Sequence, residues 1–187
     1  MPGRKTKPTI QTLARVYSDL ATGREDFRYA LGTFMNAFFM DYMDKDERQS
    51  LINDPIQVED HPTEQQRGWA AFCAGAAEYL ADHYELQCPA WAASPAYQMP
   101  EPWYILPNAN NAAKEHFQKT TPLAFRCRNV FCGDRVFTNA HPSSREPGNI
   151  RELQRMREAL LATLSPSERE TYLAKRRGKP RITTITT

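Results

Sequence analysis

The sequence predicts a mainly α fold: an irregular multi-helix bundle crossed by a strap of prolines and aromatic residues, with one short β-hairpin as a candidate addition. Apolar residues recur at helical spacing through most of the first 86 residues, and aromatic residues alternate with prolines from Pro89 to Pro107. Of the 187 residues, 41% are hydrophobic and 11% aromatic, so the chain can bury a core and is not fully disordered. No apolar run reaches the roughly 18–20 residues of a membrane-spanning helix, so no membrane association is expected.

Three helices and one shorter helix are expected before residue 87. Apolar periodicity places one over residues 9–21 and a second, with the widest apolar stripe, over residues 24–43. The shorter helix is expected over residues 46–52. Thr63 and Gln66 then match a capping box, which predicts that a helix begins there and continues through the apolar residues that follow.

The middle of the chain is expected to be irregular, because proline is excluded from helix interiors and central strands. Five prolines fall between Pro89 and Pro107. The aromatic residues among them nevertheless favour burial, since each can remove about 150–250 Å² from water. We therefore expect an ordered strap across the helices, followed by a short helix near residues 110–119. The aromatic residues expected to anchor it are Trp91, Trp103, Tyr104, Phe125 and Phe131.

The stretch from Thr121 to Phe137 is a candidate β-hairpin that turns at Gly133 and Asp134. In an extended segment, Arg126 and Arg128 would project together from the side opposite Phe125 and could clamp an anion. The sequence leaves open the alternative that both arginines pair with acidic residues of the helical body.

A run of helix breakers from His141 to Gly148 marks the best candidate boundary. Beyond it, Ser165, Pro166 and Glu168 supply an N-cap, a first-turn proline and a capping-box glutamate, which predict a helix. The expected division is a disordered basic N-terminus (1–8), a helical core domain with the strap (9–141), a linker (142–148), C-terminal helices (149–177) and a disordered tail (178–187).

Charge is distributed unevenly, although the formal net charge is only +2. Residues 1–119 contain 11 basic and 16 acidic residues, whereas residues 120–187 contain 13 basic and 6 acidic ones. The run at the end of the chain is typical of contacts with phosphates or with an acidic protein surface, including the chain's own helical body. It is also typical of a solvated helix end, where cations complement the helix dipole. The cations of this run are Lys175, Arg176, Arg177, Lys179 and Arg181.

No pattern predicts catalysis or a metal site. Cys127 and Cys132 have His116 and His141 nearby in the sequence, but their spacing is wider than the pairs typical of structural zinc sites. Buried thiols are the better interpretation, and Cys73 lies within an apolar helical pattern. Since the chain also has no glycine-rich phosphate loop, HExxH or GxSxG motif, we expect neither a cofactor nor an enzymatic activity.

Three blocks of the middle segment resemble a group of small, uncharacterised bacterial proteins. The blocks are Pro89-Ala-Trp91, Pro102-Trp103-Tyr104 and the stretch from Thr121 to Phe131, which in that group follows the pattern Ser/Thr-Pro-x-x-Phe-x-Arg-Arg. The resemblance covers roughly residues 10–137, and Cys127 stands where the group usually has arginine. Proteins of this group are often encoded beside nucleotidyltransferase-like genes. The resemblance therefore implies an antitoxin-like or accessory protein that binds another protein, for which a toxin-like enzyme is one candidate.

Together these observations predict a non-catalytic protein-interaction protein, an antitoxin-like or accessory component of a bacterial gene pair. Its basic C-terminal extension is expected to bind a protein partner. The alternative is a nucleic-acid-binding regulator that contacts phosphates through Arg126, Arg128 and the run from Lys175 to Arg181. Sparse cysteines, and no apolar segment after the basic stretch at residues 1–7, favour a cytoplasmic location.

Overall fold

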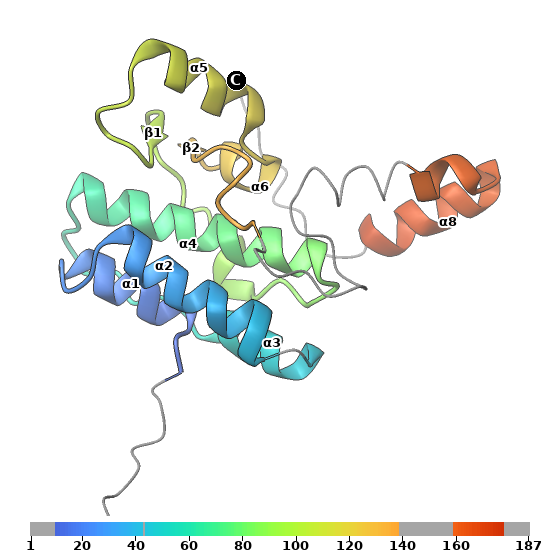
Figure 1. Ribbon diagram of the computed structural model, residues 1–187, viewed down its shortest axis with the longest axis horizontal. Helices are drawn as coiled ribbons and strands as arrows, with labels where there is room; N and C mark the ends of the chain where they lie inside the picture. The colour runs from blue at the N-terminus through green and yellow to red at the C-terminus, as the bar shows by residue number, and fades with distance from the viewer. Residues whose placement is uncertain (1–9, 43, 139–158, 178–187) are drawn as a thin grey trace, which may run out of the picture.

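Helix α4 (Glu64–His83) is the central element of the fold, which we describe from a computed structural model over residues 10–42, 44–138 and 159–177. The capping box expected at its start is present: the Thr63 hydroxyl accepts from the Gln66 amide, and the Gln66 side chain accepts from the Thr63 amide. Nearly every residue from Gly68 to Ala81 is buried, and most of them are small. Small side chains allow neighbouring elements to approach this helix closely from several sides (Figure 1).

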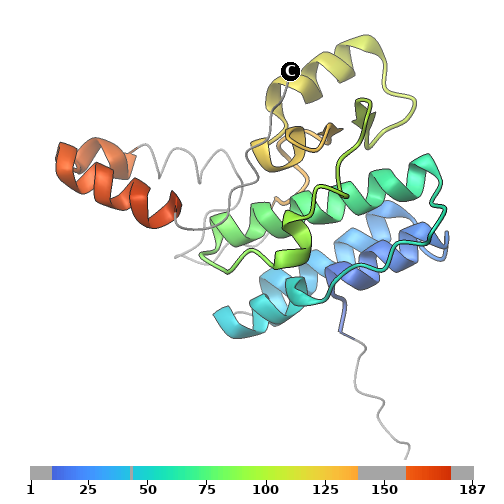
Figure 2. The same cartoon turned by 180° about the vertical axis from the view of Figure 1, so that it is seen from behind.

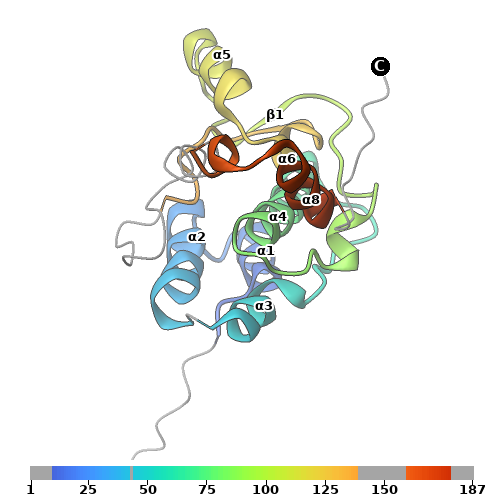
Figure 3. The ribbon, with the colours of Figure 1, turned by 90° about the vertical axis from the view of Figure 1, so that its right-hand side faces the viewer.

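Helix α1 (Leu13–Ala21) packs along α4, and α2 (Phe27–Asn36) packs against α1. Helix α3 (Lys45–Asn53) follows, and an end-on view shows α1 to α4 gathered around one core (Figure 3). The mainly α fold is thus confirmed. The helix expected over residues 24–43 is divided, because α2 continues into a π-helical turn, η1 (Ala37–Asp41).

Arg48 of α3 stabilises this π-helical turn from inside the protein. Its side chain donates from Nε to the carbonyls of Phe38 and Tyr42, at 2.9 and 3.0 Å. The guanidinium lies 5.1 Å from the centre of the Phe38 ring and 5.2 Å from that of Tyr84. Arg48 is only 4% exposed, so its charge is buried among carbonyls and aromatic rings.

The strap between α4 and the following helices is ordered and packs against α4. It contains a 3₁₀ turn, η2 (Ala90–Ala93), and the two-residue strand β1 (Trp103–Tyr104), and Figure 2 shows it beside α4. Two α4 glycines allow this contact. A Cβ on Gly68 would lie 2.2 Å from the Trp103 indole, and one on Gly75 would lie 2.7 Å from the Phe125 ring. Neither glycine could carry a side chain without displacing an aromatic ring.

The candidate hairpin between Thr121 and Phe137 does not form. Its first part is the short helix α6 (Leu123–Arg126), which packs on α4, and its second part is the strand β2 (Val130–Phe131). Strand β2 pairs in parallel with β1 of the strap. Between α6 and β2, Asn129 adopts a φ of +56°, a conformation that asparagine tolerates, and its side chain bonds the Met99 carbonyl of the strap. The strap therefore supplies the partner that a second hairpin strand would have supplied.

Helices α5 (Asn111–Thr120) and α8 (Pro166–Arg177) are polar. Helix α5 has no buried residue and stands away from the core (Figure 3). Helix α8 begins as expected, with the Ser165 hydroxyl bonded to Glu168, which lowers the pKa of that exposed carboxyl. Among the residues that the structure describes, no helix has both the length and the apolar composition needed to cross a membrane. Residues 1–8, the linker at 142–148 and the tail at 178–187 lie outside the described residues.

Candidate functional site

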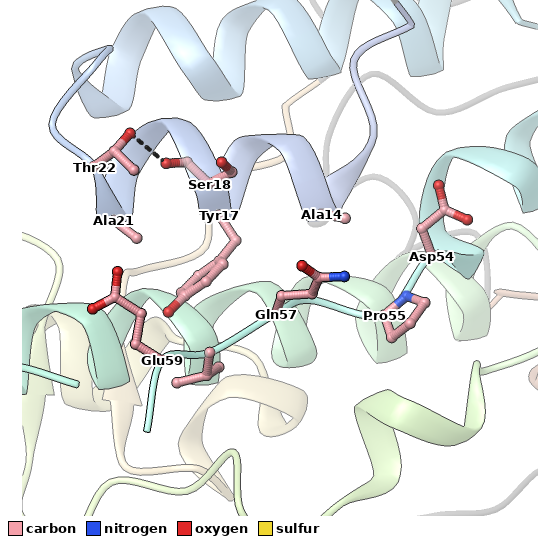
Figure 4. A pocket seen from close by; sticks show the side chains of 10 residues that line it. Ala14, Tyr17, Ser18, Ala21, Thr22, Asp54, Pro55, Gln57 and Glu59 are labelled. Carbon is pink, nitrogen blue, oxygen red and sulfur yellow. Dashed lines mark hydrogen bonds between the residues drawn. The ribbon is translucent and has the colours of Figure 1, made fainter. Parts of the chain in front are cut away.

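A groove of about 720 Å³ lies between α1 and the segment that joins α3 to α4 (Figure 4). On one side, the groove is lined by a single face of α1, whose residues recur at helical spacing. On the other side lies the connecting segment. The lining residues are Ala14, Tyr17, Ser18, Ala21 and Thr22 of α1, and Asp54, Pro55, Gln57, Val58 and Glu59 of the segment.

The connecting segment resembles an unpaired β-strand. Ile56 is buried, Gln57 is exposed, Val58 is half-buried and Glu59 is exposed, which is the alternation of a strand with one covered face. Within the chain that the structure describes, no hydrogen bond reaches the backbone of residues 57–60. A free strand-like backbone of this kind is a template for pairing with another extended chain.

Tyr17 is the most deeply buried polar side chain of the groove. It is 3% exposed, and its ring extends from α1 toward the connecting segment near Glu59 (Figure 4). Burial raises the pKa of its hydroxyl, and the proximity of Cys73 and Glu59 raises it further, so the phenol is neutral at pH 7. Its hydroxyl makes no hydrogen bond among the described residues, and its oxygen is not one of their buried unpartnered atoms, so it is accessible from the groove.

The groove carries negative charge only. Asp54 and Glu59 line it from opposite ends, and no lysine or arginine does (Figure 4). Neither carboxylate forms an ion pair within the described part of the chain. Residues 44–64 around it contain seven acidic residues and two basic ones, of which Arg48 is buried. The groove therefore favours a cationic ligand.

The structure separates the two arginines that were expected to project together, so the expected anion clamp does not form. Arg126 is exposed at the end of α6, whereas Arg128 is 2% exposed. The guanidinium of Arg128 donates to the Glu78 carboxylate and to two backbone carbonyls, those of Ala92 and Ala124. The reason is that the segment is helical rather than extended, which directs Arg128 inward to α4. The alternative interpretation, pairing with an acid of the helical body, is therefore confirmed for Arg128.

The remaining sequence-predicted residues fall into two sets. The strap aromatics pack at separate places. Trp103 and Phe125 are buried against Trp69 and Phe72 of α4, whereas Trp91, Tyr104 and Phe131 are half-buried, with Tyr104 stacked on Phe131. The cations of the C-terminal run lie largely outside the described structure: residues 175–177 end α8 without described side chains, and Lys179 and Arg181 lie beyond it.

Cys73 and Cys132 are buried thiols, as expected for such residues, whereas Cys88 and Cys127 are half-buried. Burial raises the pKa of Cys73, Cys127 and Cys132, the opposite of the shift that activates a thiol. Cys132 also contacts the carbonyl of Gly133, with Sγ 3.6 Å from the oxygen. Among the described residues, no three His, Cys, Asp or Glu side chains are grouped so that they could hold a metal ion.

The groove was not predicted from the sequence, which indicated no helix between the short one over residues 46–52 and the one that begins at the Thr63 capping box. The available signal was the alternation of Ile56 and Val58 with Gln57 and Glu59, together with the acidic residues of this loop. That signal does not reveal which helix faces the segment. Tyr17 was similarly hidden, because its spacing on α1 is that of an ordinary core residue.

Compared with protein-family models, with curated proteins and with solved structures, the chain matches none of them.

Proposed function

We propose that this chain is a non-catalytic protein-interaction protein, whose acidic helical body carries a basic C-terminal extension that binds a protein partner. The observation that supports this most is the division of charge between the two parts. Residues 10–138 contain 17 acidic and 11 basic residues, whereas residues 139–187 contain 10 basic and 5 acidic ones.

Several cations of the body are already engaged within it, which leaves the extension as the main basic surface. Arg128 and Arg48 are buried, and Arg24 pairs with the buried Asp19 at 3.2 Å. Lys45 lies 3.7 Å from Glu85. The extension, by contrast, holds five cations in the seven residues from 175 to 181. A cationic segment of this density is suited to an acidic surface of a partner.

The groove also supports recognition rather than reaction. Its ionisable groups are two carboxylates at opposite ends and a phenol whose raised pKa keeps it protonated. Nucleophilic catalysis would need an activated nucleophile beside a base, and the groove lining contains neither a cysteine nor a histidine.

The resemblance noted above leads to a finer proposal, in which the chain is the antitoxin-like or accessory component of a bacterial gene pair and the partner is a toxin-like enzyme. The direct test is to co-express the chain with the product of the neighbouring gene. We expect a complex of defined stoichiometry by light scattering, and we expect deletion of residues 165–187 to weaken it strongly. Unchanged affinity after this deletion would remove the extension from the interface.

The rival proposal, a nucleic-acid-binding regulator, loses Arg128 as a phosphate contact, because this side chain is buried. It would then depend on Arg126 and the run from Lys175 to Arg181. Titration of the full chain with duplex DNA distinguishes the two proposals. Phosphate contacts predict a log–log salt slope of about −0.9 per contact, whereas an absence of binding at low salt contradicts the rival.

A further inference from the structure

We propose that the groove between α1 and residues 54–59 binds a cationic peptide in extended conformation, and that residues 178–187 of this chain are its occupant. This proposal involves the same extension as the proposed function, but it concerns the chain alone and does not depend on a partner.

An extended peptide is indicated by the connecting segment. Its exposed and covered residues alternate, and its backbone from Gln57 to Asp60 makes no hydrogen bond within the described chain. An added strand would pair with these free amide and carbonyl groups, as in recognition by strand addition. Ala14, Ala21 and Val58 provide small or apolar surface on which the side chains of that strand could pack.

A cationic and hydrogen-bonding peptide is indicated by the polar groups of the groove. Asp54 and Glu59 have no ion-pair partner among the described residues, and Asp60 follows directly as a third exposed acid. The Tyr17 hydroxyl is an independent indication, because the residue is only 3% exposed, lines the groove with an accessible hydroxyl, and makes no hydrogen bond among the described residues. A backbone carbonyl or a threonine hydroxyl of the occupant would satisfy it.

Residues 178–187 have the composition that these groups require. Lys179 and Arg181 supply positive charge opposite the acidic residues of the groove. The six residues that follow, Ile182 to Thr187, are all isoleucine or threonine, whose branched side chains favour the extended conformation.

The length of the intervening chain permits this contact. The 20 residues from 139 to 158 can span up to about 66 Å when extended and about 30 Å even when helical. A body of the size of residues 10–138 has a radius of gyration of only about 14 Å. Because the occupant is tethered, even weak intrinsic affinity suffices for occupancy. A partner would then have to compete with the groove for part of the extension.

Hydrogen–deuterium exchange on the full chain tests occupancy of the groove. The wild-type chain is compared with the variant Lys179→Glu/Arg181→Glu, whose charges would be repelled by the groove. At low salt we expect the amides of Gln57–Asp60 to exchange about tenfold more slowly in the wild-type chain. Equal exchange rates in the two proteins would overturn the proposal.

Binding in trans tests the chemistry of the site. A fluorescent peptide with the sequence of residues 178–187 is titrated into the full-length Lys179→Glu/Arg181→Glu protein, in which the groove is open. Adding Tyr17→Phe is expected to weaken binding about fivefold, and adding Asp54→Asn/Glu59→Gln about tenfold.

Matched controls make the same chemical changes elsewhere on the body. Tyr29→Phe removes a hydroxyl from an exposed tyrosine, and Glu101→Gln/Glu115→Gln removes two exposed carboxylates outside the groove. We expect both controls to leave peptide affinity unchanged. If the controls weaken binding as much as the groove variants, the peptide is responding to net charge and the site assignment is wrong.

The same measurements also distinguish a second possible occupant, residues 178–187 of another copy of the chain. Protection that rises with protein concentration, together with a doubled mass in solution, would contradict docking within one chain. All of these experiments are done without a partner. Their failure therefore leaves the co-expression test of the proposed function unaffected, and failure of that test leaves these results standing.

Discussion

Arg128 and Glu78 form a part-buried ion pair that joins two regions 50 residues apart in the sequence, with Nη1 and Oε2 at 2.7 Å. The same guanidinium donates to the carbonyls of Ala124 and Ala92, at 2.5 and 2.7 Å. One side chain thus connects α4, α6 and the 3₁₀ turn η2. It helps to hold the strap against the helical body, and it does so from a position of 2% exposure.

Replacement of Arg128 by alanine is therefore expected to destabilise the fold by about 3–5 kcal/mol, because Glu78 and two carbonyls would lose a buried partner together. The free energy of unfolding in urea, monitored by circular dichroism, measures this loss. Arg126→Ala is the matched control. Because Arg126 is exposed two positions earlier, its replacement should change stability by no more than about 0.5 kcal/mol. Similar losses for the two variants would contradict a structural role specific to Arg128.

Gly68→Ala is expected to destabilise the protein by about 1–3 kcal/mol, because the added methyl group would collide with the Trp103 indole at 2.2 Å. Gly32→Ala is the opposite case. Gly32 is also within a helix, α2, but nothing lies within 4 Å of the position of its Cβ. Alanine there should stabilise the protein by about 0.5–1 kcal/mol through its helix propensity. Thermal unfolding of the two variants should therefore shift the Tm in opposite directions, and a shift in the same direction would contradict the packing at Gly68.

Arg48→Lys is expected to cost about 1–2 kcal/mol of stability, although charge is retained. Lysine lacks the planar guanidinium that can donate to the carbonyls of Phe38 and Tyr42 while it lies against two aromatic rings. The exposed Arg28 of α2 provides the control, since Arg28→Lys should leave the stability unchanged. Chemical denaturation measures both. If Arg48→Lys left the stability unchanged, charge alone would be enough to stabilise the π-helical turn.

Stability is expected to fall at alkaline pH because of the buried thiols. Burial raises the pKa of Cys73 and Cys132 above the ordinary value of 9.0, so the folded state binds these protons more tightly than the unfolded chain does. The contribution of the thiols to the free energy of unfolding is complete below pH 9. Above that pH it decreases by up to about 1.4 kcal/mol per pH unit for each thiol.

The measurement is urea unfolding at a series of pH values from 7 to 11 for the wild-type chain and for Cys73→Ala/Cys132→Ala. The double variant should show a shallower decline, whatever its stability at pH 7. A decline remains in the variant, because burial also raises the pKa of Tyr79. Parallel curves for the two proteins would contradict the burial of the thiols.

Much of the local structure could be predicted from sequence because it depends on residues that are close in the chain. The capping box of Thr63 and Gln66 and the start of α8 at Ser165 and Glu168 are contacts between residues three apart. The mainly α fold and the burial of Trp103 likewise follow from periodicity and from the cost of exposing a large apolar ring. The division of α2 into α-helical and π-helical parts could not be predicted in this way, because it depends on the contact with Arg48.

The charge division depends on the fold more than the sequence suggests. The charges were counted on either side of residue 120, but α6 and β2 pack on α4, so residues 120–138 belong to the acidic body, within the core domain expected over residues 9–141. Arg128 is then an internal structural residue, and the basic part of the chain begins beyond the body. The body is still acidic and the extension is still basic, but the boundary between them is set by packing.

By itself, the sequence determined most of the helices, the caps of α4 and α8, the aromatic strap and the positions of the charged residues, since these follow from contacts within a turn or two and from composition. The tertiary structure alone decided that Arg128 faces Glu78, that the strap supplies the partner of β2, and that Tyr17 and Glu59 face one groove. Such contacts join residues tens of positions apart. Many residues are equally polar, so local sequence does not show which of them will be in contact. These contacts form only when the helices pack, because the energy of each one depends on its burial and geometry.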